Sequence, residues 1–267
     1  MSDAVDKFVL VEATKTHQGK DKPLHFQENK SRYGKFLDRI IHVVVDEYPE
    51  YVGHSAWLLE HHQRNMIMRG LEGCIPEDVI LISDIDEIPN RDKIKKFKDE
   101  KGIKIFKQRM FYYYLNCINA EIRGSDYSWL GTVMVPYSPT LVPQNLRTLS
   151  MNLIARYPKN LWQQPNWWLW IFRNIYWKGE TLRFVDSGGW HFSYLGGVER
   201  IINKLEAFAH TEYNKEEYKD AQKIKEAINS GKDIFGRSFI YKYIPLDSTY
   251  PEYIFKNRDK FQHLLKT

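Results

Sequence analysis

The chain has 267 residues, of which 43% are hydrophobic and 27% are charged, and its formal net charge is +5 at pH 7. This length and composition suit one soluble α/β domain spanning residues 1–267 and exclude a repeat or low-complexity protein. Two cysteines exclude a disulfide framework, and the lack of a signal-peptide core or an apolar run of about 20 residues predicts a cytoplasmic chain without a membrane span.

The first predicted elements are two apolar strands, Lys7–Glu12 and Arg39–Asp46. Their unbroken β-branched runs are typical of strands buried on both faces of a parallel sheet. His42, inside the second strand, is interpreted as a core or edge residue in preference to a ligand. A fully apolar strand so close to Met1 requires neighbours on both sides, so we expect that a strand preceding it is missing.

A helix is predicted from Ser55 to Gly70, with Ser55 as the N-cap and Gly70 as the stop signal. Arg64 lies late in this helix, and its guanidinium group is able to pair with a phosphate. A surface or ion-paired arginine is the alternative, and the sequence favours neither interpretation.

The next stretch, Glu77–Pro89, joins an apolar strand to three carboxylates. Val79–Ile82 is predicted to be buried on both faces of a parallel sheet, and ligands of α/β sheets bind beyond the carboxyl ends of the strands. Asp84, Asp86 and Glu87 lie at that end. An Asp-x-Asp pair is able to hold a divalent cation that bridges the phosphates of a nucleotide. The alternative is a solvated turn at the end of a strand.

An amphipathic helix is predicted over Asp92–Lys101, and its lysines favour a solvated face over a nucleic-acid patch. We therefore expect no nucleic-acid partner. Extended segments over Ile103–Leu115 and Trp129–Pro136 are predicted to pair into an antiparallel platform beside the acidic stretch. The polar loop between them, Asn116–Ser128, carries the carboxylate of Glu121.

Five of the eight tryptophans fall in one region, namely Trp162, Trp167, Trp168, Trp170 and Trp177. Core packing is the favoured interpretation, because buried tryptophans fill volume. Exposed indole faces also stack on sugar rings, so one or two of the five are candidates for lining an acceptor groove.

Paired glycines mark a second concentrated signal in Phe184–Gly197, where they flank Asp186 and His191. Glycine lets the backbone approach a ligand closely or adopt a positive φ. His191 is therefore a candidate ligand for a metal or a phosphate, and a hydrogen-bonded structural histidine is the alternative. Two polar helices, predicted over Val198–His210 and Lys215–Asn229, form a C-terminal helical extension.

Four motifs in this order resemble glycosyltransferase family 17, the bisecting-GlcNAc transferase family. They are Phe8–Leu24, His62–Asn65, Asp78–Pro89 and Gly189–Ser193. The resemblance implies a GT-A fold with a nucleotide-sugar-binding sheet flanked by helices, a UDP-GlcNAc donor, Mn²⁺ or Mg²⁺, and inversion at the anomeric carbon. It also implies an N-terminal truncation, because family members begin with a further strand and helix ahead of the segment matching Val5–Glu12.

The resemblance also assigns roles to residues. Asp84 and Asp86 match the metal and diphosphate site of the family, and His191 matches the histidine that returns to the metal late in such folds. We predict Glu12 and Arg64 as further donor-binding residues. The implied acceptor is a hydroxyl group of a glycan or glycoconjugate.

The predicted reaction is a single displacement in which a carboxylate removes the proton of the acceptor hydroxyl. Asp186 is the first choice for this base and Glu121 is the second. One alternative is a non-catalytic carbohydrate- or nucleotide-binding remnant of such an enzyme. A second alternative, a metal-dependent phosphotransferase or nuclease, has no support beyond the acidic residues.

Overall fold

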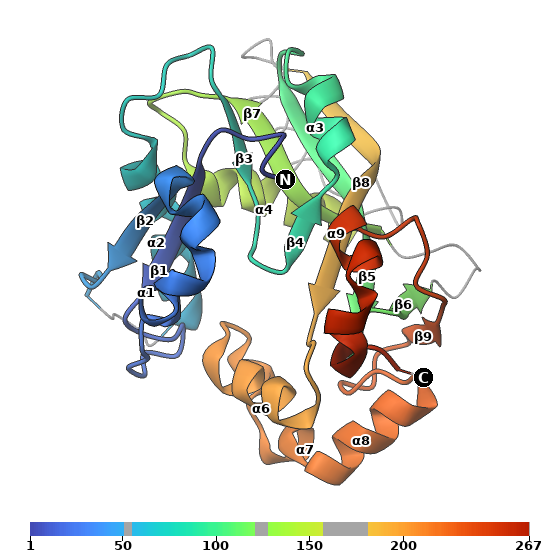
Figure 1. Ribbon diagram of the computed structural model, residues 1–267. Helices are drawn as coiled ribbons and strands as arrows, with labels where there is room; N and C mark the ends of the chain where they lie inside the picture. The colour runs from blue at the N-terminus through green and yellow to red at the C-terminus, as the bar shows by residue number, and fades with distance from the viewer. Residues whose placement is uncertain (51–54, 121–127, 157–180, 267) are drawn as a thin grey trace. The chain divides into compact units, whose positions relative to one another are not determined.

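The computed structural model describes residues 1–50, 55–120, 128–156 and 181–266, with residues 151–156 described by their helical backbone alone. The chain divides into two compact units (Figure 1). The first comprises Met1–Gly73, Val142–Gln144 and Tyr194–Ser238, and the second comprises Cys74–Leu141, Asn145–Ser193 and Phe239–Thr267.

The first unit contains a parallel pair of strands, β1 (Phe8–Ala13) and β2 (Ile40–Val45). Both strands were predicted, and the strands and their parallel pairing are confirmed. The predicted burial on both faces is wrong, because Phe8–Val11 are partly exposed and Ile41 is exposed. The helix α1 (His25–Glu28) and the 3₁₀ helix η1 (Lys30–Arg39) form the crossover that a parallel connection requires.

The predicted helix over residues 55–70 is confirmed with a change of helix type. It begins as α2 (Ala56–Asn65) and continues as the 3₁₀ helix η3 (Met66–Leu71), and η3 packs on both strands. Gly70 lies where η3 meets β1, and a Cβ atom there would collide with the side chain of Val9. Close packing of η3 on the strand therefore requires glycine at this position.

The C-terminal part of the first unit is helical, as predicted. It contains α6 (Val198–Ala207), the 3₁₀ helix η6 (Thr211–Tyr213), α7 (Glu216–Lys219) and α8 (Ala221–Ser230). The helix predicted over residues 215–229 is divided, because the Asp220 side chain accepts hydrogen bonds from two backbone N–H groups and starts a new helix there. In the described ranges, no helix is both long enough and apolar enough to cross a membrane.

The second unit contains a mainly antiparallel sheet (Figure 1). The order β3-β7-β5-β6-β9 joins five of its strands, while β8 pairs with β5 in parallel and with β4 in antiparallel. The strands are β3 (Val79–Ile82), β4 (Glu87–Pro89), β5 (Ile103–Tyr112), β6 (Cys117–Ala120), β7 (Ser128–Pro136), β8 (Leu182–Ser193) and β9 (Ile240–Tyr243).

The helices of this unit are α3 (Arg91–Phe97), most of α4 (Pro143–Arg156), α9 (Glu252–Lys256) and the 3₁₀ helix η7 (Arg258–Leu264). The helix α3 confirms the prediction of an amphipathic helix. It buries Ile94 and Phe97 and leaves Lys95 and Lys96 exposed. The Asn90 side chain caps its first turn, two residues before the predicted start.

The predicted parallel sheet is wrong for Val79–Ile82. Among the described strands, β3 pairs only with β7, in the antiparallel sense, and it stands at the end of the strand order. Ile80 and Ile82 are buried, whereas Val79 and Leu81 are partly exposed. Four apolar residues in a row fit a strand of either direction, because periodicity alone does not encode the direction of the partner. The predicted antiparallel pairing of β5 with β7 is confirmed.

The core of the second unit is built on β5, where Ile105, Phe106 and Phe111 are fully buried. Phe111 stacks on Phe192 of β8, with ring centroids 5.0 Å apart. Burial of one such phenylalanine contributes about 1.5–3 kcal/mol to stability. This packing holds β8 on β5 and fixes the backbone next to His191.

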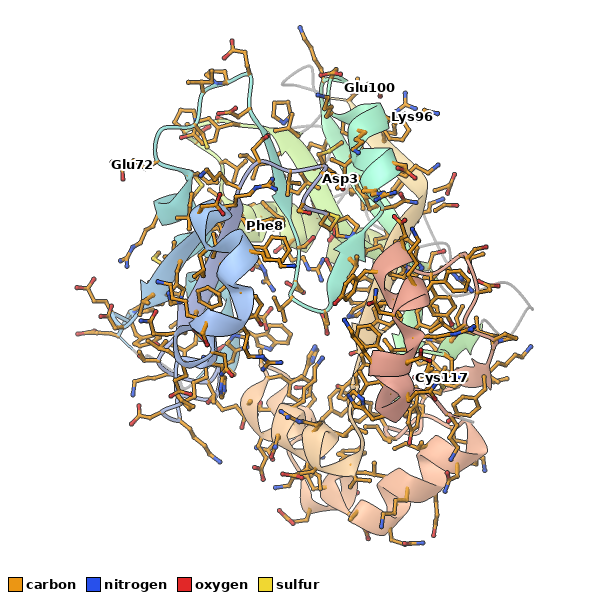
Figure 2. The ribbon with its side chains drawn as sticks, in the orientation of Figure 1. Asp3, Phe8, Glu72, Lys96, Glu100 and Cys117 are labelled. Atoms are coloured by element: carbon orange, nitrogen blue, oxygen red, sulfur yellow. The ribbon has the colours of Figure 1, made fainter. Side chains whose placement is uncertain are left out.

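The reactivity of Cys117 reports on the packing between β6 and β9. Cys117, labelled in Figure 2, is fully buried and faces Tyr243 of β9 in the strand register. Burial raises the pKa of the thiol from 9.0 to about 12, although a hydrogen bond with Tyr243 acts in the opposite direction. Because the folded pKa exceeds the unfolded pKa, the thiol contributes stability below pH 9 that is lost as the pH rises toward 12.

We expect Cys117 to be inert toward a thiol reagent in the native chain at pH 8, because the thiolate is the reactive form. The measurement is a 5,5′-dithiobis(2-nitrobenzoic acid) titration of a Cys74→Ser variant, which lacks the more accessible thiol. One equivalent should react after unfolding in urea and none before it. Rapid reaction of the folded variant would contradict this packing.

Candidate functional site

The acidic stretch forms a short turn between β3 and β4. Before it, the Ser83 hydroxyl lies 2.5 Å from the Thr132 hydroxyl of β7. Across it, the N–H of Glu87 donates to the carbonyl of Asp84 over 3.0 Å. Ile85, between the two aspartates, exposes 93% of its surface. The turn is therefore anchored on both sides and carries its tip into solvent.

Strand β4 brings this turn to β8. Glu87 lies opposite His191 in the antiparallel register, and the N–H of Phe192 donates to the carbonyl of Asp86 over 2.8 Å. Gly189 permits the approach, because its φ is +137° and a Cβ atom there would collide with the backbone of β4. The glycine pair noted in the sequence therefore serves strand packing: Gly189 lies against β4 and Gly188 lies against β5.

Asp86 and His191 form a close pair at the end of β4. His191 Nε2 lies 3.3 Å from Asp86 Oδ2. The side chain of His191 is 7% exposed and that of Asp86 is 25% exposed. The Trp129 ring packs on the imidazole, with ring centroids 4.7 Å apart. His191 Nδ1 is buried and has no hydrogen-bond partner in the described part of the chain.

Arg147 of α4 links the other two acids. Its Nη2 atom donates to Asp84 Oδ2 and to Glu87 Oε1, each over 2.6 Å. The Arg147 side chain is only 5% exposed. Burial opposes the charge on the guanidinium, but Glu87 and Asp84 outweigh burial and raise the pKa of Arg147. The group is therefore a permanent positive charge inside the acidic cluster.

Glu87 is the most enclosed member of this cluster, with a side chain that is 0% exposed. Its Oε1 atom also accepts the indole N–H of Trp129 over 2.7 Å, and its Oε2 atom accepts the N–H of Asp84 over 3.2 Å. Burial raises the pKa of Glu87, and the positive charge of Arg147 opposes this rise.

The arrangement places three carboxylates, one guanidinium and one imidazole together. Within the described residues, no group of three His, Cys, Asp or Glu side chains is arranged to hold a metal ion. Asp86 and His191 offer two donors side by side, whereas Asp84 is paired with Arg147. The structure thus brings the three predicted metal ligands into one cluster and gives Asp84 a second partner.

Of the two predicted catalytic carboxylates, Asp186 and Glu121, only Asp186 lies within the described residues. Asp186 on β8 is 80% exposed, and its Oδ1 atom forms an ion pair with Lys107 Nζ over 2.8 Å. Glu121 lies outside the described residues, and so do the five clustered tryptophans, Trp162, Trp167, Trp168, Trp170 and Trp177. The choice of base therefore stays a prediction.

The predicted donor-binding residues Glu12 and Arg64 belong to the first unit. Glu12 is buried on β1, where its carboxylate accepts the N–H of Phe26 over 2.8 Å and lies 3.1 Å from His42 Nε2. Arg64 forms an ion pair with Glu60 over 2.9 Å. His42 is thus a partly buried strand residue with a carboxylate partner, and the donor contacts of Glu12 and Arg64 stay predictions.

We expect Glu12→Ala to lower the free energy of unfolding by about 1–3 kcal/mol, because it leaves a buried N–H of α1 without an acceptor. The measurement is urea unfolding followed by circular dichroism. Glu28→Ala, an exposed change in the same helix, is the matched control and should have little effect. Unchanged stability with weakened nucleotide binding would instead support a donor contact.

Three members of the cluster, Glu87, Trp129 and Arg147, were not predicted as site residues. Glu87 was noted at the end of the strand but was given no role. Trp129 lay at the start of a predicted strand, and nothing in the sequence marked its indole as a partner of Glu87. Arg147 lies in α4, which was not predicted. Pro143 and the leucines at positions 146, 149 and 153 were the available signal, because they give a first-turn proline followed by helical spacing.

Comparison with known proteins agrees with the resemblance found in the motifs. A family model described as glycosyltransferase family 17 matches residues 1–140, more than half of the chain. Two proteins named β-1,4-mannosyl-glycoprotein 4-β-N-acetylglucosaminyltransferase, from Rattus norvegicus and Homo sapiens, are each 25% identical to the chain and match 100% and 99% of it. The chain spans about half the length of these curated relatives, 51% of each. No solved structure matches the chain.

Proposed function

Because the chain belongs to glycosyltransferase family 17, we propose that it is a metal-dependent inverting enzyme that moves GlcNAc from UDP-GlcNAc to a hydroxyl group of a glycan acceptor. The names of the relatives support GlcNAc as the transferred sugar. We assign the GT-A fold on the same grounds, and the parallel pair β1–β2 followed by the acidic turn after β3 is consistent with it.

The observation that carries the proposal is the pairing of Asp86 with His191. Two ligands held at about 2.1 Å by one octahedral cation lie about 3.0 Å apart, and the 3.3 Å between Asp86 Oδ2 and His191 Nε2 is close to this separation. Cations such as Mg²⁺ bind through one or two protein groups, with the remaining positions taken by phosphate oxygens and water. The two donors therefore fit a divalent cation, which would supply positive charge for a diphosphate.

In this proposal Asp86 and His191 would hold Mn²⁺ or Mg²⁺. Asp84, the third predicted ligand, lies in the same cluster and is paired with Arg147. When bound, the cation supplies positive charge to the departing diphosphate. A carboxylate takes the proton of the acceptor hydroxyl while the acceptor oxygen bonds to the anomeric carbon. In the same step the bond between the anomeric carbon and the UDP oxygen breaks. Asp186 and Glu121 remain the proposed bases, in that order.

The test is release of UDP from UDP-GlcNAc by the purified full chain. We expect release that requires Mn²⁺, stops with a chelator and rises with a glycan acceptor. A thermal-shift screen of nucleotide sugars with Mn²⁺ checks the donor, because a ligand of the native state raises the melting temperature. Binding of a nucleotide sugar without turnover would identify a non-catalytic remnant, and no binding at all would remove the proposal.

A further inference from the structure

Arg147 joins two acids through a single nitrogen. Its Nη2 atom reaches both Asp84 Oδ2 and Glu87 Oε1, whereas Nη1 is buried without a hydrogen-bond partner in the described part of the chain. A guanidinium that served one carboxylate would normally use two parallel N–H groups. Here the geometry instead fixes the distance and direction between two different carboxylates.

Glu87 and Trp129 connect Arg147 to the pair of Asp86 and His191. The Oε1 atom of Glu87 accepts hydrogen bonds from Arg147 and from the indole N–H of Trp129, so the indole cannot turn without breaking a partly buried hydrogen bond. The same indole packs on the imidazole of His191, with ring centroids 4.7 Å apart. The contacts therefore run without interruption from Arg147 through Glu87 and Trp129 to the imidazole.

Three of the four residues on this path are buried, and Trp129 is half-buried. The Arg147, Glu87 and His191 side chains are 5%, 0% and 7% exposed, so water does not compete for their contacts. Arg147 Cζ lies 5.5 Å from the Trp129 ring centroid, which adds a cation–π contact to the same indole. Partners outside the ligand sphere orient the ligands of metal sites and change metal affinity by about 10–100-fold.

We propose that Arg147 is a positioning residue for this site: it holds Asp84 and Glu87 in one arrangement and, through Glu87 and Trp129, fixes the imidazole of His191 beside Asp86. This inference rests on the proposed function, because Arg147 would position the residues, Asp86 and His191, that hold the proposed cation. The rival explanation is that Arg147 only stabilises the fold as the counter-charge of Glu87.

The experiment measures Mn²⁺ affinity directly, by the electron paramagnetic resonance signal of free Mn²⁺ during titration of the full chain. The variants are Arg147→Lys and Arg147→Ala, the second with and without millimolar guanidinium. Arg183→Ala is the matched control, because Arg183 lies in the same unit and pairs with exposed Glu100 at the other end of β8. Melting temperatures without Mn²⁺ report the stability of each variant.

We expect Arg147→Ala to bind Mn²⁺ at least about 10-fold more weakly and guanidinium to restore part of this loss. Arg147→Lys keeps the charge, but the lysine side chain is one bond shorter and lacks the planar guanidinium. This variant should therefore fold and also bind Mn²⁺ more weakly than the native chain. The control should bind Mn²⁺ like the native chain. The indole N–H resonance of Trp129, assigned with Trp129→Phe, should move in both Arg147 variants.

Two negative results have different meanings. If the native chain itself fails to bind Mn²⁺, the proposed function fails and the inference falls with it. If the native chain binds Mn²⁺ and a folded Arg147→Lys or Arg147→Ala variant binds it equally well or more tightly, the positioning role alone is wrong. If Arg147→Ala does not fold, the lysine variant decides.

Discussion

Replacing Glu87 with alanine should lower the free energy of unfolding by about 3–5 kcal/mol, the usual cost of removing one partner of a buried ion pair. Arg147 would keep Asp84 as a partner but lose the fully enclosed carboxylate of Glu87, and the indole N–H of Trp129 would lose its acceptor. Denaturant unfolding of the full chain, followed by both circular dichroism and tryptophan fluorescence, measures the change.

Two comparison variants separate charge from hydrogen bonding. Glu87→Gln keeps an oxygen for Trp129 and removes the charge, so its loss of stability should fall between those of the native chain and the alanine variant. Glu100→Ala removes an exposed acid just after α3 (Figure 2), which pairs with Arg183, and should change stability by less than about 1 kcal/mol. Equal losses in Glu87→Ala and Glu100→Ala would contradict the enclosed network.

Asp86→Asn should reduce both Mn²⁺ affinity and UDP release by at least about 100-fold, because a direct ligand contributes at least as much as the partners behind it. The side chain keeps its shape, so the fold should survive. Mn²⁺ titration and the UDP-release assay, run on the same preparation, provide the two readouts. A loss of turnover with unchanged Mn²⁺ affinity would remove Asp86 from the ligand set.

Asp92→Asn is the matched control for this change, because Asp92 is an exposed acid on α3 whose contact with Arg91 spans 3.6 Å. It should leave both readouts unchanged. Asp186→Asn tests the base in the same assays. If Asp186 takes the proton of the acceptor, turnover should fall while Mn²⁺ binding persists. Full turnover in Asp186→Asn would leave Glu121 as the proposed base.

Local pattern was enough to find most strands of the described chain. The β-branched and aromatic runs at Phe8–Ala13, Ile40–Val45, Ile103–Tyr112 and Ser128–Pro136 identified their strands within a few residues. The direction of β3 was lost, because its four apolar residues match either kind of sheet. The short β9 was missed, since Ile240–Tyr243 alternates polar and apolar residues over only four positions. The strands β4, β6 and β8 were missed as well. The predicted polar loop Asn116–Ser128 is wrong at its start, where Cys117–Ala120 form the fully buried strand β6.

The acidic half of the candidate site was also visible in the sequence, because Asp84 and Asp86 follow an apolar run directly. His191 was found through its glycines, although Gly189 serves the approach of β4 to β8 and Gly188 the approach of β5 to β8. Arg147 was not found, since its partners lie about 60 residues earlier and helical spacing carries no information on distant charge pairs. Such pairs are set by the packing of α4, which a single sequence does not show.

The pairing of β4 with β8 has a consequence for biosynthesis. Glu87 and His191 face each other across a register that joins positions more than 100 residues apart along the chain. When the acidic residues Asp84–Glu87 leave the ribosome, His191 has not yet been synthesised. Contacts between residues so far apart in sequence also form slowly. A nascent chain therefore carries Asp86 without its counterpart until translation has passed His191, and the Asp86–His191 pair forms only after synthesis of β8.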